Sequence, residues 1–98
     1  MITTKITLES NCGLLGVFLH PPGAADPIPL PGVNHTSAPD LEPGVYAVSL
    51  AGSGNVPGTK VALTFEATNS VTRKRTVRSD GTIIAWITFE LTAAGEIK

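Results

Sequence analysis

The only thiol in this chain of 98 residues belongs to Cys12. A catalytic cysteine needs a base that activates the thiol, and the two histidines, His20 and His35, lie in or beside a proline-rich segment. Cys12 itself falls in a turn sequence, residues 11–13, where a small residue is common. Because no activating partner is visible, the sequence predicts a protein without enzymatic activity.

Metal and phosphate chemistry are not indicated either. Five residues of metal-ligating type fall in or beside the proline-rich segment, namely His20, Asp26, His35, Asp40 and Glu42. Their spacing matches no recognised ligand pattern, so we interpret them as solvated loop residues. The glycines of residues 51–58 follow a predicted strand but open no helix, so the helix terminus that binds phosphate is missing. We therefore expect no metal site and no cofactor.

Residues 71–91, VTRKRTVRSDGTIIAWITFEL, carry the most informative pattern. Four cations come first, at Arg73, Lys74, Arg75 and Arg78. The net charge of −1 hides this cluster, because without it three cations remain against eight acidic residues, a balance of −5. The only tryptophan, Trp86, lies in the apolar strand that follows. Asp80-Gly81 predicts a hairpin turn between the two strands.

The hairpin would bring a cation onto the indole in either register. With a two-residue loop Arg75 faces Trp86, and with a loop of residues 79–81 Lys74 faces it instead. An exposed contact of this kind contributes about 0.5 to 1 kcal/mol.

Two interpretations of this surface remain open. In the first, the basic strand is an edge strand whose charges block sheet-to-sheet aggregation, with Trp86 packed under their stems. In the second, five residues form a binding surface for another subunit or ligand, namely Arg73, Lys74, Arg75, Ile84 and Trp86. Tryptophan and arginine are the favoured hot-spot residues, and the last strand is apolar on both faces and needs a second cover.

The elements that position these residues are strands, because apolar and β-branched residues recur with a period of two. Strands are expected at residues 2–9, 14–20, 45–50, 59–67, 71–78 and 82–91. The residues expected to be buried include Ile6, Leu8, Val17, Leu63, Phe65, Ile87 and Phe89. Seven of the eight prolines fall in residues 21–43, which predicts a long connection with only a short edge piece near residues 28–33.

Six or seven strands without a helix predict a small antiparallel β-sandwich formed by a single domain, residues 1–98. The proline-rich segment would be the long crossing connection of a Greek key. A small closed β-barrel is the alternative. The sequence LEPGVYAVSL, residues 41–50, resembles the strands of immunoglobulin-like and transthyretin-like sandwiches.

The sequence also bears on location. A single cysteine excludes an intramolecular disulfide, and the N-terminus lacks the pattern of a signal peptide, so we expect a cytoplasmic protein. A mature exported domain is the alternative, and only there would the glycosylation pattern of residues 34–36 have meaning. No apolar run approaches the ~20 residues that cross a bilayer, so no membrane is expected.

These features favour a binding or assembly module that self-associates through its last two strands, with a second copy or another protein as partner. One alternative is a polyanion or nucleic-acid binder that uses residues 73–78 with Trp86 as a stacking platform, although the rest of the chain is acidic. The other is a carbohydrate-binding module, for which three Phe, one Tyr and one Trp provide few stacking groups.

Overall fold

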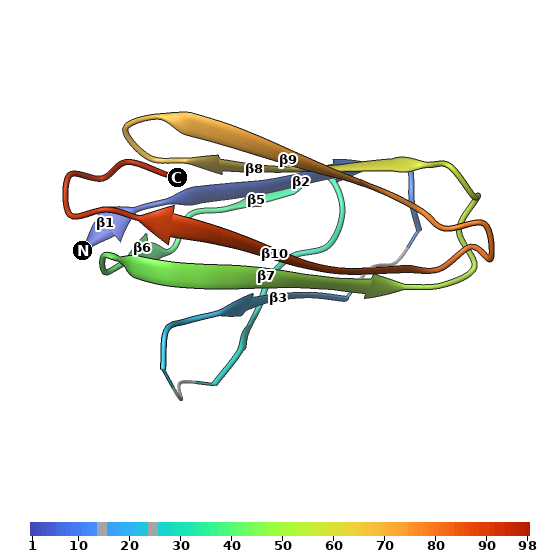
Figure 1. The fold of residues 1–98 in the computed structure, drawn as a ribbon, viewed down its shortest axis with the longest axis horizontal. Helices are drawn as coiled ribbons and strands as arrows, with labels where there is room; N and C mark the ends of the chain where they lie inside the picture. Colours follow the sequence, from blue (N-terminus) through green and yellow to red (C-terminus); the bar gives the residue numbers. More distant parts are fainter. Residues whose placement is uncertain (14–15, 24–25) are drawn as a thin grey trace.

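The computed structural model describes residues 1–13, 16–23 and 26–98, and every regular element within them is a β-strand (Figure 1). The strands are β1 (Ile2–Thr3), β2 (Lys5–Ser10), β3 (Gly16–His20), β4 (Ile28–Pro29), β5 (His35–Ser37), β6 (Asp40–Leu41), β7 (Gly44–Gly52), β8 (Lys60–Glu66), β9 (Ser70–Thr76) and β10 (Ile83–Leu91). Six of them have five to nine residues and match the expected strands. Residues 14–15 of the expected strand 14–20 lie outside the described residues.

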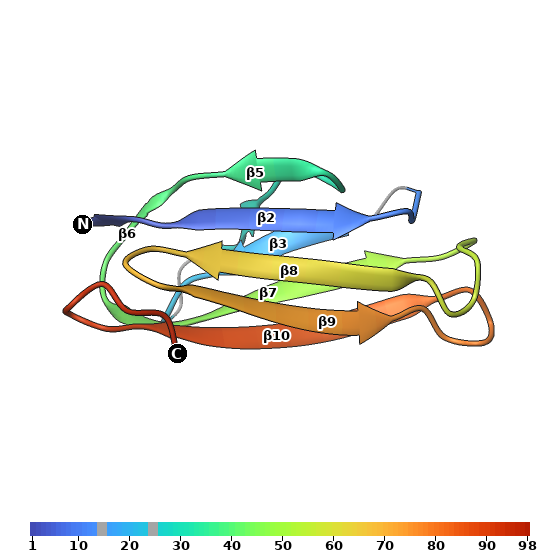
Figure 2. The same cartoon turned by 90° about the horizontal axis from the view of Figure 1, so that it is seen from above.

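Two four-stranded antiparallel sheets form a sandwich, so the expected fold class is confirmed and a closed barrel is wrong. The upper sheet of Figure 1 has the order β5-β2-β8-β9, and the lower sheet has the order β4-β3-β7-β10. Strands at the same position in the two sheets follow one another in the chain, as β2 and β3, β7 and β8, or β9 and β10 do. Viewed from above, the two layers lie over one another (Figure 2).

The proline-rich segment passes from one sheet to the other, as expected. Its first strand, β4, pairs with β3 at the edge of the lower sheet, which confirms the short edge piece. Two further short strands were not expected: β5 joins the edge of the upper sheet and β6 pairs with β1. Pro29 is tolerated in β4 because an edge strand needs hydrogen bonds on one side only.

The expected strand 2–9 is divided into β1 and β2 at Thr4. The Thr4 side chain is fully buried, and the backbone N–H of Thr4 donates to the carbonyl of Pro39 over 2.9 Å. The alternation itself holds, because Ile6 and Leu8 are each 3% exposed while Lys5 is exposed.

The core lies between the sheets and contains all seven residues expected to be buried. At its centre the ring of Phe65 from the upper sheet stacks on Phe89 from the lower sheet, with centroids 4.2 Å apart. Tyr46 stacks on the same Phe89 ring at 5.4 Å. Aromatic pairs of this kind add about 0.5 to 1.5 kcal/mol beyond the burial of their area.

The expected pairing of residues 71–78 with residues 82–91 is wrong, although the turn between them exists. Arg78 N–H donates to the Thr82 carbonyl over 2.9 Å, which closes a loop of residues 79–81. The strands on either side of this turn belong to different sheets. β9 aligns seven residues with β8, and β10 aligns nine residues with β7. Each strand thereby gains a full ladder, and their inward side chains cover the core from opposite sides.

Candidate functional site

The five residues predicted to bind do not form one surface, because β9 and β10 belong to different sheets. Residues directly opposite one another in an antiparallel ladder point to the same face. Arg73 lies opposite Leu63 and Arg75 opposite Val61, so both arginines are on the core-facing side of β9. Lys74 is on the outer side. The prediction that a cation meets the indole is therefore wrong.

The position of β9 agrees with the first interpretation, since β9 is an edge strand of the upper sheet. The Arg75 guanidinium donates from Nη1 to the Lys74 carbonyl over 2.8 Å. This bond occupies a backbone acceptor next to the charged side chains. Cationic side chains on an edge discourage pairing with another sheet.

Trp86 lies in the lower sheet, where its outward neighbour across the ladder is Ser49 of β7. The indole is 60% exposed and makes an aromatic contact with His20 of β3, with ring centroids 4.5 Å apart. His20 Nε2 also hydrogen-bonds to Ser49 Oγ over 2.8 Å. Trp86 is thus held by its own sheet rather than covered by cation stems.

Sequence reasoning missed His20 as a partner of Trp86. It considered His20 only as a base for Cys12 or as a residue of metal-ligating type. The contact depends on β3 and β10 flanking the same strand, β7, and no local pattern in the sequence reveals that order.

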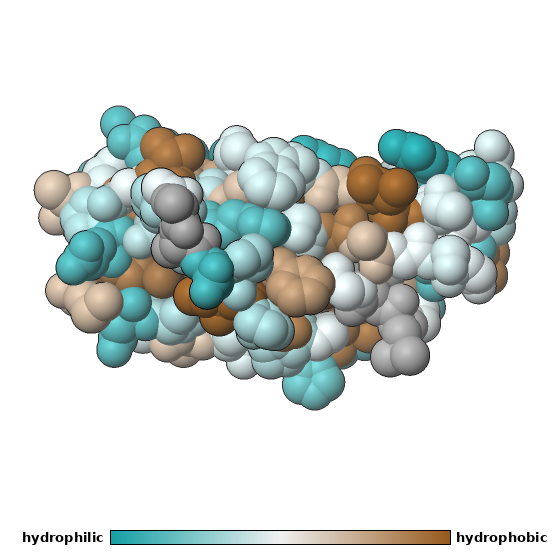
Figure 3. All heavy atoms as spheres, turned by 90° about the horizontal axis from the view of Figure 1, so that it is seen from below, coloured by the Kyte–Doolittle hydropathy of each residue, from teal (hydrophilic) through white to brown (hydrophobic). Residues whose placement is uncertain are grey.

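The outer side of the lower sheet, named here the lower face, is largely apolar. The outward residues of β3, β7 and β10 are Gly16, Phe18, His20, Val45, Ala47, Ser49, Ala51, Ile84, Trp86, Thr88 and Glu90. Of these, Ile84 is 66% exposed, Val45 60% and Phe18 41%. Figure 3 shows this side of the molecule, with apolar patches separated by more polar ones. Within these outward positions, Glu90 is the one Asp, Glu, Lys or Arg.

The outer side of the upper sheet, named here the upper face, is polar. The outward residues of β2, β8 and β9 are Lys5, Thr7, Glu9, Lys60, Ala62, Thr64, Glu66, Ser70, Thr72, Lys74 and Thr76. A row of threonines runs across the sheet through hydroxyl contacts of 2.9 Å (Thr7 with Thr36) and 3.0 Å (Thr64 with Thr72).

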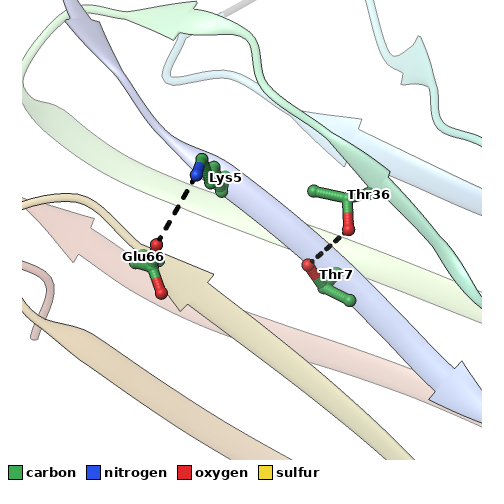
Figure 4. A network of polar contacts seen from close by, with 4 residues as sticks. All are labelled: Lys5, Thr7, Thr36 and Glu66. Atoms are coloured by element: carbon green, nitrogen blue, oxygen red, sulfur yellow. Dashed lines mark hydrogen bonds and ion pairs between the residues drawn. The ribbon is translucent and has the colours of Figure 1, made fainter.

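Figure 4 shows the first of these contacts and the 3.9 Å pair between Lys5 and Glu66. Both side chains of the ion pair are more than half exposed, so it contributes only about 0 to 1 kcal/mol. The upper face is therefore well solvated.

Each face has a shallow hollow. The one on the lower face has a volume of about 340 Å³ and is lined by residues that include His20, Val45, Ala47, Trp86 and Thr88. The one on the upper face has a volume of about 440 Å³ and is lined by Glu9, Ser10, Asn11, Asn34, Lys60, Ala62 and Lys74. The first combines the rings of His20, Tyr46 and Trp86 with small residues, and the second combines charges of both signs.

The remaining candidate residues have structural surroundings. Cys12 is 8% exposed and belongs to the core. Burial raises the pKa of Tyr46, whose hydroxyl donates to the Glu42 carbonyl over 2.6 Å. Within the described part of the chain, no three His, Cys, Asp or Glu side chains gather closely enough to hold a metal ion.

Asn34, the residue that would carry a glycan, lies beside the end of β2. Its side chain accepts from Ser10 N–H over 3.2 Å and donates to the Ser10 carbonyl over 3.1 Å. Asn34 has a φ of 59°, a left-handed conformation that asparagine tolerates.

No known protein family, no curated protein and no solved structure matches this chain. In residues 1–13, 16–23 and 26–98, no helix has the length and apolar character needed to cross a membrane.

Proposed function

We propose that this protein is a non-enzymatic assembly module that self-associates through the lower sheet, with Ile84 and Trp86 near the centre of the contact. The supporting observation is the difference between the two outer faces. Four large apolar side chains of the lower face are exposed, Phe18, Val45, Ile84 and Trp86. At the outward positions of β2, β8 and β9, by contrast, the apolar residue is the small Ala62.

Water contact with such a surface is costly, and burial stabilises by roughly 25 cal/mol for each Å² of apolar area. The molecule extends 40 × 27 × 18 Å, which leaves room for the roughly 800 Å² that each partner contributes to a standard interface. Glu90 is the one Asp, Glu, Lys or Arg among the outward positions defined above, so two copies would bring little like charge together. The cations of β9 have no place in this contact.

The mass in solution tests the proposal. Light scattering over a range of concentrations should give more than the 10.1 kDa of one chain, and Trp86→Ala should lower the mass at a fixed concentration. Lys74→Ala, on the opposite face, is the matched control and should keep the wild-type mass. A wild-type protein that stays at 10.1 kDa up to millimolar concentration would refute self-association.

A second candidate function is supported by the hollow on the upper face. Lys60 and Lys74, which carry ammonium groups, line this hollow together with Glu9 and Asn11, whose side chains can bind hydroxyls. A small sugar acid combines both chemistries, which links the polyanion and carbohydrate alternatives at one place. Glucuronate should shift the NMR amide signals around Ala62 more than glucose does. Lys74→Ala should weaken the shift and Lys5→Ala should not, and equal shifts with both sugars would contradict the idea.

A further inference from the structure

The sandwich has four edge strands, β4 and β10 in the lower sheet and β5 and β9 in the upper sheet. The free side of an edge strand presents unpaired N–H and C=O groups that can template pairing with another chain. Three of the four edges carry features that prevent this. β4 has two residues, one of them Pro29, and β5 has three. β9 carries the cations and the Arg75 bond to the Lys74 carbonyl.

The fourth edge, β10, lacks such features. It runs for nine residues, and the sequence IIAWITFEL contains neither proline nor a cation. Within residues 1–13, 16–23 and 26–98, only its end is covered, by the C-terminal residues. Glu90 and Lys98 exchange two backbone hydrogen bonds of 2.9 Å, and Leu91 forms a bridge with Ile97. This edge therefore already accepts one extended segment.

The direction of the free groups follows from this pairing. In an antiparallel strand, alternate residues turn their backbone groups to the same side. The backbone groups of Glu90 face the C-terminal residues. The backbone groups of Ile84, Trp86 and Thr88 therefore face the same side, which is free and points away from β7. Among the described residues, no strand pairs with that side of residues 84–88. The open stretch is bounded by Glu90 at one end and by the turn at Thr82 at the other.

We propose that residues 84–88 of β10 pair antiparallel with the same residues of a second copy, about a two-fold axis at Trp86. The stretch is self-complementary in this register: Trp86 lies opposite Trp86 of the second copy, and Ile84 lies opposite Thr88 of the second copy. All three positions turn their backbone groups to the shared edge, so each forms a hydrogen-bonded pair. The two lower sheets become one continuous sheet, with the indoles side by side on its outer face.

This inference rests on the self-association of the proposed function, but it places the contact at the β10 edge rather than across the apolar lower face. Pairing along five residues buries less than a standard interface, so the dimer should be weak and concentration-dependent. A contact between two lower faces is the competing geometry, and the two differ in what happens to the backbone of β10.

Hydrogen exchange of the unchanged protein is the first test. Edge pairing predicts that the amides of Ile84, Trp86 and Thr88 exchange at least tenfold more slowly at a concentration where the dimer forms than at one where it dissociates. The amide of Thr72, on the edge of β9, is the control and should not change. This readout needs no variant, so it decides even if a substitution prevents folding.

A proline substitution gives the second test. Thr88→Pro removes an N–H that faces the free edge and leaves the β7 ladder intact, so it should give a monomer with nearly the wild-type thermal midpoint. Thr88→Val keeps the amide and should remain dimeric. Val45→Lys places a charge on the lower face away from the edge and should also remain dimeric.

The outcomes separate the two proposals. A dimer that survives Thr88→Pro, shows no concentration-dependent protection of Trp86 and is lost in Val45→Lys would overturn edge pairing and leave self-association through the lower face standing. A monomer at every concentration would overturn both.

Discussion

The imidazole of His20 lies against the indole of Trp86, with ring centroids 4.5 Å apart and planes inclined at 39°. The two residues come from β3 and β10, which do not pair with one another but flank β7. Between them β7 presents small side chains, Ala47 and Ser49, and Ala47 is only 6% exposed. The bond from His20 to Ser49 holds the imidazole in place. Trp86 is therefore ordered before any partner binds, which lowers the entropic cost of association.

His20→Ala should loosen the indole. We expect a change in Trp86 fluorescence and a loss of about 0.5 to 1.5 kcal/mol of the free energy of unfolding, the usual contribution of an aromatic pair. The dimer should also weaken. His35→Ala is the control, since His35 is exposed and bonds to the Val33 carbonyl of its own segment. Identical fluorescence in His20→Ala and wild type would contradict the contact.

Phe65→Ala should be among the most damaging single substitutions. The ring is fully buried and stacks on Phe89, so its removal should cost about 3 to 5 kcal/mol of the free energy of unfolding. Phe18→Ala removes a ring that is 41% exposed and should cost clearly less. Denaturant titration of both variants measures the difference, and equal losses would show that the assigned facing of the strands is wrong.

Gly81→Ala should be worse than Gly54→Ala, although both glycines have positive φ, 81° and 71°. A Cβ at Gly81 would lie 2.8 Å from the carbonyl oxygen of Asn55, whereas a Cβ at Gly54 would meet nothing within 4 Å. The left-handed conformation alone costs alanine about 1 to 2 kcal/mol, which Gly54→Ala should show. Thermal unfolding should reveal a larger loss for Gly81→Ala, and equal midpoints would contradict the close approach of the two loops.

Asp80 should make the stability depend on pH in the acid range. Hydrogen bonds from the Thr82 side chain, over 2.6 Å, and from its N–H, over 3.0 Å, lower the pKa of this carboxyl below 3.8. A carboxyl whose pKa is lower in the folded state than in the unfolded state stabilises the fold at pH values above the unfolded pKa. This stabilisation is lost as the pH falls through the folded pKa.

Thr82→Val should therefore move the pKa of Asp80 back toward 3.8, because it removes the hydroxyl donor. Thr72→Val, on β9, should leave the Asp80 titration unchanged. NMR titration of the Asp80 carboxyl measures both variants, and a Thr82→Val curve that overlays the wild type would show that the hydroxyl has no such effect.

The period of two in the sequence was sufficient to predict the fold class and the inward side chains. It places Ile6 and Leu8 inward on one strand and Ile87 and Phe89 inward on another. The facing of these side chains follows from the alternation within each strand alone. It does not specify which strands pair. The turn at residues 79–81 exists, but the partners of β9 and β10 are β8 and β7, and those choices depend on ladders formed with distant parts of the chain.

The candidate site could be predicted only in part for the same reason. Alternation on β10 places Ile84 and Trp86 outward, and both are exposed. The hairpin register with a two-residue loop placed Arg75 beside the outward Trp86, yet Arg73 and Arg75 share the side of Leu63 and Val61. An edge strand tolerates this because long stems can carry the charges to the rim of the sheet.

The correspondence between the strand orders of the two sheets also governs how the chain can fold. Among the longer strands, only β8 and β9 pair across a tight turn, so this hairpin can form in about 1 to 10 μs. β2 must instead find β8 across most of the chain, from Lys5 to Glu66, and β10 must find β7 after both strands of the hairpin have been made. Chains dominated by such distant pairings fold in milliseconds to seconds. Until it pairs with β7, β10 exposes the backbone groups of both its sides, so the strand can template pairing between chains while the protein folds.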